Sequence, residues 1–342
     1  MVSVVVNNFN YAEFLGEAIE SALGQRAVKT EVVVVDDGST DGSRAVLGSY
    51  AGRVTTVLKR NGGQASAFNA GFRAARGDIV IFLDADDMLL PRTAARVSRL
   101  FARRHQTVKV HYRLEVVDAN GRPTGAFLPP LARPLPEGDI RERVLSAPDD
   151  MPYPPTSGNA FSAAALRTLL PMPEGPYTRL ADVYLLSLAP LLGPVARLDD
   201  VGGQYRAHTR NLHYGAGCDL HRVRATIRAT SVTHEHVARL ATSLGILDGG
   251  EPRFASVTDL AQRLISLRLE PAVHPIASDR VARLAASGAA AALRRSDMAL
   301  TRRLVYAMWF AAAALAPRRV TRELAEDLFG AWWAESRREP SA

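Results

Sequence analysis

Three carboxylates follow one apolar run in the first third of the chain. The run Ile79–Leu83 leads directly into Asp84, Asp86 and Asp87. Like charges this close repel one another unless a cation or hydrogen-bond donors lie among them. Carboxylate oxygens are the ligands that Mg²⁺ and Mn²⁺ prefer, and these ions often share them with substrate phosphates. The alternative is that the acids are solvated turn residues or a helix cap, because Asp is common at both places.

Two other apolar runs also end in polar segments. "VSVVV" leads into "NNFN", with Asn7 and Asn10, and "EVVVV" leads into "DDGS", with Asp36 and Asp37. Continuous apolar strands that alternate with helices indicate a parallel sheet covered on both faces. Ligands of such sheets bind beyond the carboxyl ends of the strands. We therefore expect the three polar clusters to line one crevice.

The elements that position these clusters are predicted from periodicity and from turn residues. Strands are expected at 2–6, 31–39, 54–60 and 78–84, and helices at 11–25, 39–51, 64–77 and 91–105. Ser39, Thr40 or Asp41 should cap the second helix, because these side chains accept hydrogen bonds from free backbone N–H groups. Pro91 is expected as the first residue of the fourth helix, where its missing N–H costs nothing.

The remainder of the chain divides by composition. Residues 108–125 are predicted as strand, turn and strand, 129–155 as an irregular loop with a short helix, and 178–193 as a helix containing Asp182. From Cys218 onward the sequence is rich in Ala, Leu and Arg and is typical of consecutive amphipathic helices. The change in composition predicts a boundary near residue 218.

Charge and cysteine content restrict the class of protein. The net charge is +7, with arginines spread along the chain, and no helix-turn-helix, zinc-finger or aromatic-basic RNA motif is present, so we expect no nucleic-acid partner. A mildly basic enzyme that handles anionic substrates fits better. A single cysteine fits a reducing compartment, no signal peptide is evident, and the longest apolar segment is shorter than the about 20 residues that span a bilayer. We expect a cytoplasmic protein.

Four segments together resemble the family 2 glycosyltransferases. They occur in the family's order and at its spacing over about residues 1–210: "SVVVNNFNYAEFLGEAIESALGQ", "EVVVVDDGSTDGS", "NGGQASAFNAGFRAARGDIVIFLDADD" and "ADVYL". The resemblance implies the GT-A fold, an α/β fold with a mainly parallel central sheet. It implies a nucleotide-sugar-binding half at 1–107 and an acceptor-binding half at 108–217, with a helical region at 218–342. It also implies metal-dependent inverting transfer of a sugar from a UDP-sugar to an acceptor hydroxyl, with Mn²⁺ or Mg²⁺.

The resemblance also implies roles for individual residues. Those expected to bind the nucleotide sugar are Asn7, Asn10, Asp36, Asp37, Gln64, Asn69, Asp84, Ala85, Asn159 and Arg206. Those expected to hold the metal are Asp84, Asp86 and His208. A carboxylate such as Asp37 can accept from the ring N–H of uracil or thymine. Asn69 could instead face solvent on its helix, and Arg206 could be an ordinary surface residue. His208 could be structural, as a lone His often is.

Asp182 matches the family's general base. Inverting transfer needs a carboxylate that takes the proton of the acceptor hydroxyl as it attacks. The usual motif is Glu-Asp, but Ala181 replaces the Glu here, which puts a second acceptor-binding carboxylate in doubt. Most helical Asp residues lie on exposed faces, whereas the neighbouring Leu180 and Val183 favour a cleft.

Other functions and surfaces remain open. A nucleotidyltransferase would be expected to have a Gly-rich N-terminal loop with a Lys or Arg that binds the triphosphate, and "NNFNYAEF" lacks one. The intact Asp84, Asp86 and Asp182 argue against a non-catalytic sugar-nucleotide-binding protein. Arg302, Arg303, Arg318 and Arg319 flank an apolar segment with Trp309. This pattern fits a helix on an anionic membrane. It also fits packing inside the helical region or a homodimer face, and packing is favoured.

Overall fold

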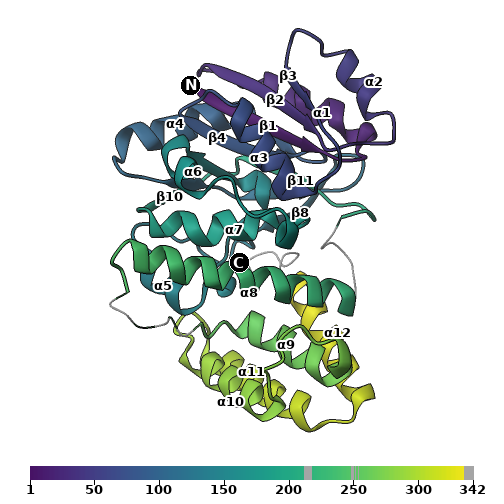
Figure 1. Ribbon diagram of the computed structural model, residues 1–342, viewed down its shortest axis with the longest axis vertical. Coiled ribbons are helices and arrows are strands. Elements are labelled where there is room, and N and C mark those ends of the chain that lie inside the picture. The colour runs from purple at the N-terminus through teal and green to yellow at the C-terminus, as the bar shows by residue number, and fades with distance from the viewer. Residues whose placement is uncertain (212–217, 248–249, 251, 253, 335–342) are drawn as a thin grey trace. The chain divides into compact units, whose positions relative to one another are not determined.

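The computed structural model describes residues 1–211, 218–247, 250, 252 and 254–334 (Figure 1). The chain forms two compact units. Unit 1 comprises Met1–Ile140 and Pro152–Asn211, and unit 2 comprises Arg141–Met151 and the described residues after Asn211. The predicted acceptor-binding half, 108–217, included the segment 141–151, which here belongs to unit 2. No helix in the described ranges combines the length and the apolar content needed to cross a membrane.

Unit 1 is built on a seven-stranded sheet in the order β10-β6-β9-β4-β1-β2-β3. The strands are β1 (Val2–Asn8), β2 (Thr30–Asp36), β3 (Thr55–Leu58), β4 (Ile79–Asp84), β6 (Lys109–His111), β9 (Asn159–Ser162) and β10 (Val195–Arg197). All neighbours are parallel except β9, which runs antiparallel to β4 and β6. The predicted α/β fold with a mainly parallel central sheet is confirmed.

A smaller sheet brings a late part of the chain back toward β4. Its order is β5 (Met88–Leu89), β11 (Gly203–Arg206), β7 (Leu114–Val117) and β8 (Pro123–Leu128). Strand β5 follows the acidic turn after β4, and β11 lies antiparallel to it. This pairing places the segment after β11, with His208, next to the acids that precede β5.

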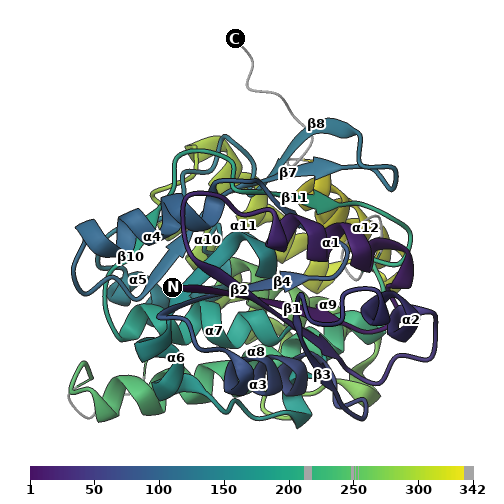
Figure 2. The ribbon, with the colours of Figure 1, turned by 90° about the horizontal axis from the view of Figure 1, so that it is seen from above.

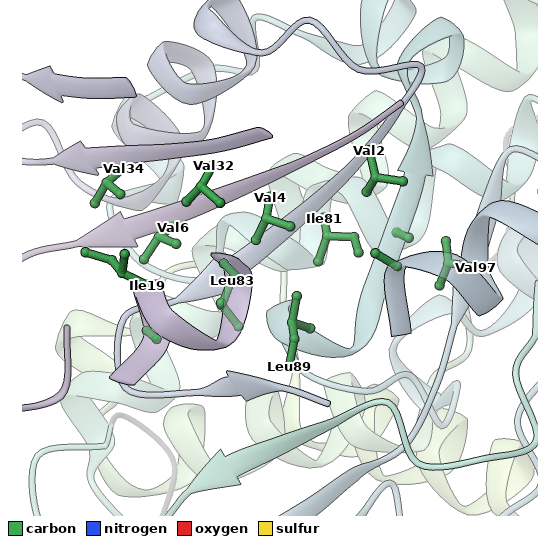
Figure 3. Packing of buried hydrophobic residues seen from close by; sticks show 14 of the residues in the cluster. Val2, Val4, Val6, Ile19, Val32, Val34, Ile81, Leu83, Leu89 and Val97 are labelled. Carbon is green, nitrogen blue, oxygen red and sulfur yellow. The ribbon is translucent and has the colours of Figure 1, made fainter. Parts of the chain in front are cut away.

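Helices cover both faces of the large sheet (Figure 2). One face carries α1 (Ala12–Leu23) and α4 (Thr93–Arg103). Alternate side chains of the strands, such as Val4 and Leu83, pack there against Ile19 and Val97 (Figure 3). These side chains are buried, and the burial of apolar surface stabilises the unit. The β-branched runs seen in the sequence therefore form the core that fixes the strand ends.

The opposite face carries α3 (Gln64–Ala74), α6 (Ala163–Leu169) and α7 (Ala181–Leu188) (Figure 2). Phe68 of α3 stacks on Phe82 of β4, with ring centroids 4.3 Å apart. Gly71 lets α3 approach the sheet closely, because a Cβ there would lie 2.3 Å from Cγ1 of Val5. The fit of α3 on the sheet fixes where its first residue, Gln64, lies.

Two details of the predicted helices are wrong. Helix α2 (Ser43–Gly48) has Gly42 at its N-cap, although Asp41 still accepts from the backbone N–H of Ser43 at 2.9 Å. Pro91 does not begin α4, because a turn precedes the N-cap, Arg92. Asp41 precedes the N-cap of α2 by one residue. Its carboxylate also accepts from the N–H of Ala12 at 2.9 Å and so connects the start of α1 to the start of α2.

Unit 2 is helical, as its composition predicts. Its helices are α5 (Arg141–Ser146), α8 (Leu220–Ser243), α9 (Val257–Leu269), α10 (Val281–Arg294), α11 (Leu300–Leu315) and α12 (Arg318–Ala334). Leu264, Leu284 and Phe310 are buried in a shared core. A Cβ at Gly288 would lie 2.1 Å from the ring of Phe310, so this glycine allows α10 and α11 to pack closely. The segment 141–151 joins this unit through Asp150, which accepts from the N–H of Val257 at 2.8 Å.

Candidate functional site

The polar ends of β1, β2 and β4 meet at one edge of the sheet. Asn7 is paired in register with Asp84, and Asn8 with Asp36. The amide of Asn7 donates to the Asp84 carboxylate at 2.6 Å, and the amide of Asn8 donates to Asp36 at 3.0 Å. The structure thus brings the three clusters together because the strands that carry them are adjacent and parallel.

The acidic turn after β4 is buried, which makes the negative charge of its carboxylates unfavourable. Asp86 and Asp87 are buried, and the backbone N–H of Asp87 closes the turn by donating to the carbonyl of Asp84 at 3.0 Å. Burial, together with the charge of Asp86, raises the pKa of Asp84 to about 7. Burial also raises the pKa of Asp87. A cation among these carboxylates would relieve both effects.

His208 reaches this turn from the segment after β11. Its Nε2 lies 3.0 Å from Oδ2 of Asp86, and the amide of Asn211 donates to the same oxygen at 3.3 Å. The ring of His208 stacks on Phe14 of α1, with centroids 4.9 Å apart. Phe14 and Asn211 were not among the predicted site residues. The helical spacing of α1 indicated only that Phe14 is apolar and buried.

The predicted metal ligands do not form a three-residue cluster. Across the described ranges, no group of three His, Cys, Asp or Glu side chains is arranged to hold a metal ion. His208 contacts Asp86 directly, so these two side chains are partners of each other. The donor set nevertheless suits a hard cation, because Mg²⁺ is commonly bound by one or two carboxylates with water and substrate phosphates as the other ligands. Asp84 and Asp86 are two such carboxylates.

Arg206 holds the acidic turn in place from within the protein. Its side chain is buried, its Nε donates to the carbonyl of Asp86 at 3.1 Å, and its Nη2 donates to Glu17 at 2.6 Å. Its backbone N–H donates to Asp87 at 3.0 Å. The expected contact with the nucleotide sugar is therefore not the role in which the structure uses this guanidinium. Arg210 lies over the ring of Tyr11, 5.2 Å from its centroid.

Asp36 and Asn10 shape the loops beside β1 and β2. Asp36 is buried and accepts from the backbone N–H of Ser39 at 3.3 Å, in addition to its bond from Asn8. The side-chain oxygen of Asn10 accepts from the N–H of Thr40 at 2.8 Å. Both side chains therefore fix the loops at this edge of the sheet through hydrogen bonds within the protein.

Asp37 organises the loop that leads into α3. Its carboxylate accepts from the N–H groups of Gly62 at 3.0 Å and Gly63 at 2.7 Å, and it forms an ion pair with Lys59. Gly63 has a positive φ of 85°, and a Cβ there would lie 2.5 Å from Cα of Thr178. Only glycine fits this conformation and this close approach without strain.

The same loop positions Asp182. The side-chain oxygen of Gln64 accepts from the backbone N–H of Ala181 at 2.9 Å, and the N–H of Gln64 donates to the carbonyl of Thr178 at 2.9 Å. Asp182 lies in the first turn of α7, and its negative charge contributes to the raised pKa of Asp84. The predicted base and the acidic turn are therefore within electrostatic reach of each other.

Lys109 on β6 is a charged residue near Asp182 that sequence reasoning missed. Its side chain is fully buried, and Nζ lies 3.9 Å from the ring centroid of Tyr153. For the residues that the structure describes, no hydrogen-bond partner of Nζ is found. Burial lowers the pKa of Lys109 well below its usual range, and the charge of Asp182 opposes this shift. The sequence "VKVH" does not indicate that Lys109 is buried, because it shows only one Lys in an apolar strand.

Three other predicted residues are engaged inside the fold. The amide of Asn69 donates to the carbonyl of Met172 and its oxygen accepts from the N–H of Met172, both at 2.9 Å. The amide of Asn159 donates to the carbonyl of Pro155 at 2.8 Å. Ala85 is buried. These residues support the loops around the crevice, and the solvent-facing alternative for Asn69 does not hold.

Comparisons with known proteins agree with the fold. The sequence model for Glycosyl transferase family 2 matches residues 3–167. An uncharacterized glycosyltransferase of Nostoc is 33% identical over 219 residues, which are 63% of this chain and 67% of that protein. The succinoglycan biosynthesis protein ExoO of Rhizobium meliloti is 40% identical over 129 residues, 37% of this chain and 36% of that one.

A solved structure covers nearly the whole chain. The crystal structure of S. aureus TarS 1–349 in complex with UDP-GlcNAc matches 94% of this chain and 91% of its own, with a TM-score of 0.51 and 16% sequence identity. At this identity the likeness concerns the fold. The sequence matches show that the chain belongs to glycosyl transferase family 2, a family of glycosyltransferase enzymes.

Proposed function

We propose that the protein transfers a sugar with inversion from a nucleotide-diphosphate donor, a UDP-sugar, to an acceptor hydroxyl, with Asp182 as the general base. The observation that carries the proposal is the hydrogen bond from the N–H of Ala181 to Gln64 at 2.9 Å, which ties the first turn of α7, with Asp182, to the loop held by Asp37. A donor held at the ends of β1, β2 and β4 would present its anomeric carbon toward α7. A base there could meet the acceptor on the side opposite the departing diphosphate, as inversion requires.

The donor-binding part of the proposal rests on the ends of β1 and β2. Asn7, Asp36 and Asp37 line this edge, and the last two are held rigidly by backbone N–H groups. A carboxylate held in one position is a good acceptor for the ring N–H of uracil, because it loses little conformational entropy when the ligand binds. The choice of uracil rests on the resemblance to the family.

Asp84 and Asp86 would hold the expected Mn²⁺ or Mg²⁺. When bound, such an ion acts as a Lewis acid that neutralises the charge of the departing diphosphate. His208 would keep Asp86 oriented through the contact at 3.0 Å. Arg206 would keep the turn in place by its bond to the carbonyl of Asp86. In this proposal His208 and Arg206 position the acidic turn, whereas the resemblance to the family implies a metal-binding role for His208 and a nucleotide-sugar-binding role for Arg206.

Asp182 would take the proton of the acceptor hydroxyl while the glycosidic bond forms. The carboxylate lies at the first turn of α7, where the helix dipole favours negative charge. Gln64 and Gly63 fix this turn through Ala181 and Thr178. The Glu that usually precedes the base is absent, so acceptor binding falls to other side chains. We propose a polysaccharide or glycoconjugate acceptor, in line with the similarity to ExoO, a succinoglycan biosynthesis protein.

Calorimetric titration of UDP, GDP and dTDP, each with and without Mn²⁺, tests the donor assignment. We expect UDP to bind with the ion and to bind at least about tenfold more weakly without it, because Asp84 and Asp86 would hold the ion and its charge would neutralise the diphosphate. Failure of all three nucleotides to bind would remove the donor proposal. Binding of UDP without any turnover of UDP-sugars would favour a non-catalytic sugar-nucleotide-binding protein. The predicted cytoplasmic location stays a prediction.

A further inference from the structure

Helix α11 turns a continuous apolar face to solvent. Large side chains on this face are exposed, from 46% at Leu304 to 86% at Leu315. The set consists of Leu300, Leu304, Val305, Met308 and Leu315. At 3.6 residues per turn, these positions fall on one side of the helix. Single exposed apolar residues are ordinary, but a stripe that runs the length of a helix marks an interaction surface.

The other side of α11 is already occupied. Tyr306, Phe310 and Ala313 are buried in the core of unit 2, against α10 and α9 (Figure 1). The indole of Trp309 donates to the carbonyl of Leu324 at 3.0 Å, which ties α11 to α12. The packing predicted for Trp309 is therefore present. The apolar stripe is additional to it and is not explained by the fold of the unit.

Arginines lie near both ends of α11, and the acid next to them in the sequence, Glu323, pairs with Arg319 at 3.6 Å. The sequence from Leu300 to Arg322 contains no Asp or Glu and five arginines: Arg302, Arg303, Arg318, Arg319 and Arg322. Arg318, Arg319 and Arg322 are exposed. Arg302 and Arg303 are half-buried, with Arg302 over the ring of Tyr306 and Nε of Arg303 donating to the carbonyl of Met298 at 2.8 Å. Arginine can lay its apolar stem along a hydrophobic surface while its guanidinium reaches an anion. The chemistry of the surface therefore fits an apolar layer edged with negative charge.

A second copy of the chain fits this face less well. A two-fold pairing of α11 with itself, parallel or antiparallel, would place the arginines of one copy beside those of the other. Like charges brought together in an interface are repulsive. An anionic lipid surface has the opposite property, because its headgroups would neutralise the arginines while its acyl chains receive the leucines.

We propose that α11 lies in the plane of an anionic lipid bilayer, with its apolar stripe at the boundary between headgroups and acyl chains and the exposed Arg318 and Arg322 on lipid phosphates. The helix has 16 residues and is about 24 Å long at 1.5 Å per residue, which is enough for a surface helix. Surface helices of this kind combine an apolar face with Lys and Arg along its borders. The interaction needs no contribution from the candidate active site.

Co-sedimentation of the full chain with vesicles tests the proposal. We expect binding to vesicles of phosphatidylcholine with phosphatidylglycerol, and much weaker binding to phosphatidylcholine alone. The double variant Leu304→Ser/Met308→Ser should bind the anionic vesicles about tenfold more weakly, because two side chains lose their apolar burial. Salt at about 1 M, where the Debye length is about 3 Å, should also reduce binding.

A matched variant separates this face from general hydrophobicity. Leu244→Ser/Val273→Ser removes two exposed apolar side chains elsewhere in unit 2 and should bind as the wild type does. All substituted positions are exposed, so circular dichroism should show unchanged folding. Absence of binding to either vesicle, or equal binding by the two double variants, would overturn the proposal. So would a wild-type dimer in analytical ultracentrifugation that Leu304→Ser/Met308→Ser converts to monomer.

Discussion

The side-chain oxygen of Gln64 accepts a hydrogen bond from the backbone N–H of Ala181 at 2.9 Å. Gln64 begins α3, and Ala181 begins α7. The bond therefore joins the loop held by Asp37 to the helix turn that carries Asp182. In the proposed reaction, Gln64 at the start of α3 therefore sets the position of Asp182, the general base.

Substitution of Gln64 should impair turnover more than nucleotide binding. Gln64→Leu removes the acceptor for the Ala181 N–H and allows the first turn of α7 to shift, and small displacements of a catalytic group are costly. We expect kcat for transfer or donor hydrolysis to fall about tenfold or more, with the Kd of UDP changed less than about threefold. Steady-state kinetics and calorimetry measure the two quantities.

The control for this variant is Gln262→Leu, the same change on α9 of unit 2, which should leave kcat unaltered. If Gln64→Leu weakens UDP binding and lowers kcat in equal proportion, Gln64 serves the donor and not the base.

Replacement of Lys109 should stabilise unit 1. The residue is buried without a hydrogen bond to Nζ from any described residue, and burial lowers its pKa. Lys109→Met fills the same space without a polar atom, so the free energy of unfolding should rise by about 1 kcal/mol or more. Lys109→Arg should destabilise the unit, because a guanidinium cannot shed its proton. Denaturant unfolding at pH 7 measures both.

The pH dependence gives an internal check on Lys109. The unfolded chain holds a proton on this amine up to about pH 10, whereas the folded protein loses it at lower pH, so its cost to stability shrinks as pH rises. The advantage of Lys109→Met should therefore narrow between pH 7 and about pH 10. A variant less stable than the wild type throughout this range would show that Lys109 is stabilising.

A buried histidine should make unit 2 less stable at alkaline pH. Burial lowers the pKa of His234, but the hydrogen bond and charge of Asp149, with Asp259 nearby, outweigh burial and Arg263, and the pKa is raised. The stability from protonated His234 is complete below its ordinary pKa of 6.5 and is lost as pH rises through the higher folded value. Phe254 stacks on the ring, with centroids 4.0 Å apart.

Denaturant unfolding followed by circular dichroism between about pH 6.5 and 9 tests this dependence. The pKa of Asp259 is raised by burial to about 6, below the window, but the pKa of Asp84 is raised to about 7 and the cost of burying Lys109 also changes with pH here. The contribution of His234 is therefore the part of the change that His234→Gln removes. His234→Gln should flatten the curve. A curve of the same slope in that variant would assign the effect to another group.

The strand ends could be predicted from the sequence because their signals are local. Continuous β-branched runs such as 32–35 indicate buried parallel strands, and parallel neighbours carry their polar ends to one edge. Asp84 and Asp36 were placed correctly at this edge for that reason. The four leading strands and the mainly parallel sheet follow from the same pattern.

The roles of Arg206 and Lys109 could not be predicted, because they depend on pairings between distant segments. Arg206 is buried only because β11 pairs with β5, more than 110 residues earlier in the sequence. Lys109 is buried because β9 crosses antiparallel between β4 and β6. The exposed stripe of α11 was visible as an apolar segment, but only the packing of Tyr306 and Phe310 decides which side faces solvent.

The central claim is that Asp182 removes the proton of the acceptor, and Asp182→Asn tests it most directly. The amide keeps the shape of the side chain but cannot accept the proton at neutral pH, so single-turnover transfer from the donor should fall about 100-fold or more. UDP should bind this variant with Mn²⁺ as it binds the wild type. Transfer at the wild-type rate by a folded Asp182→Asn protein would contradict the account.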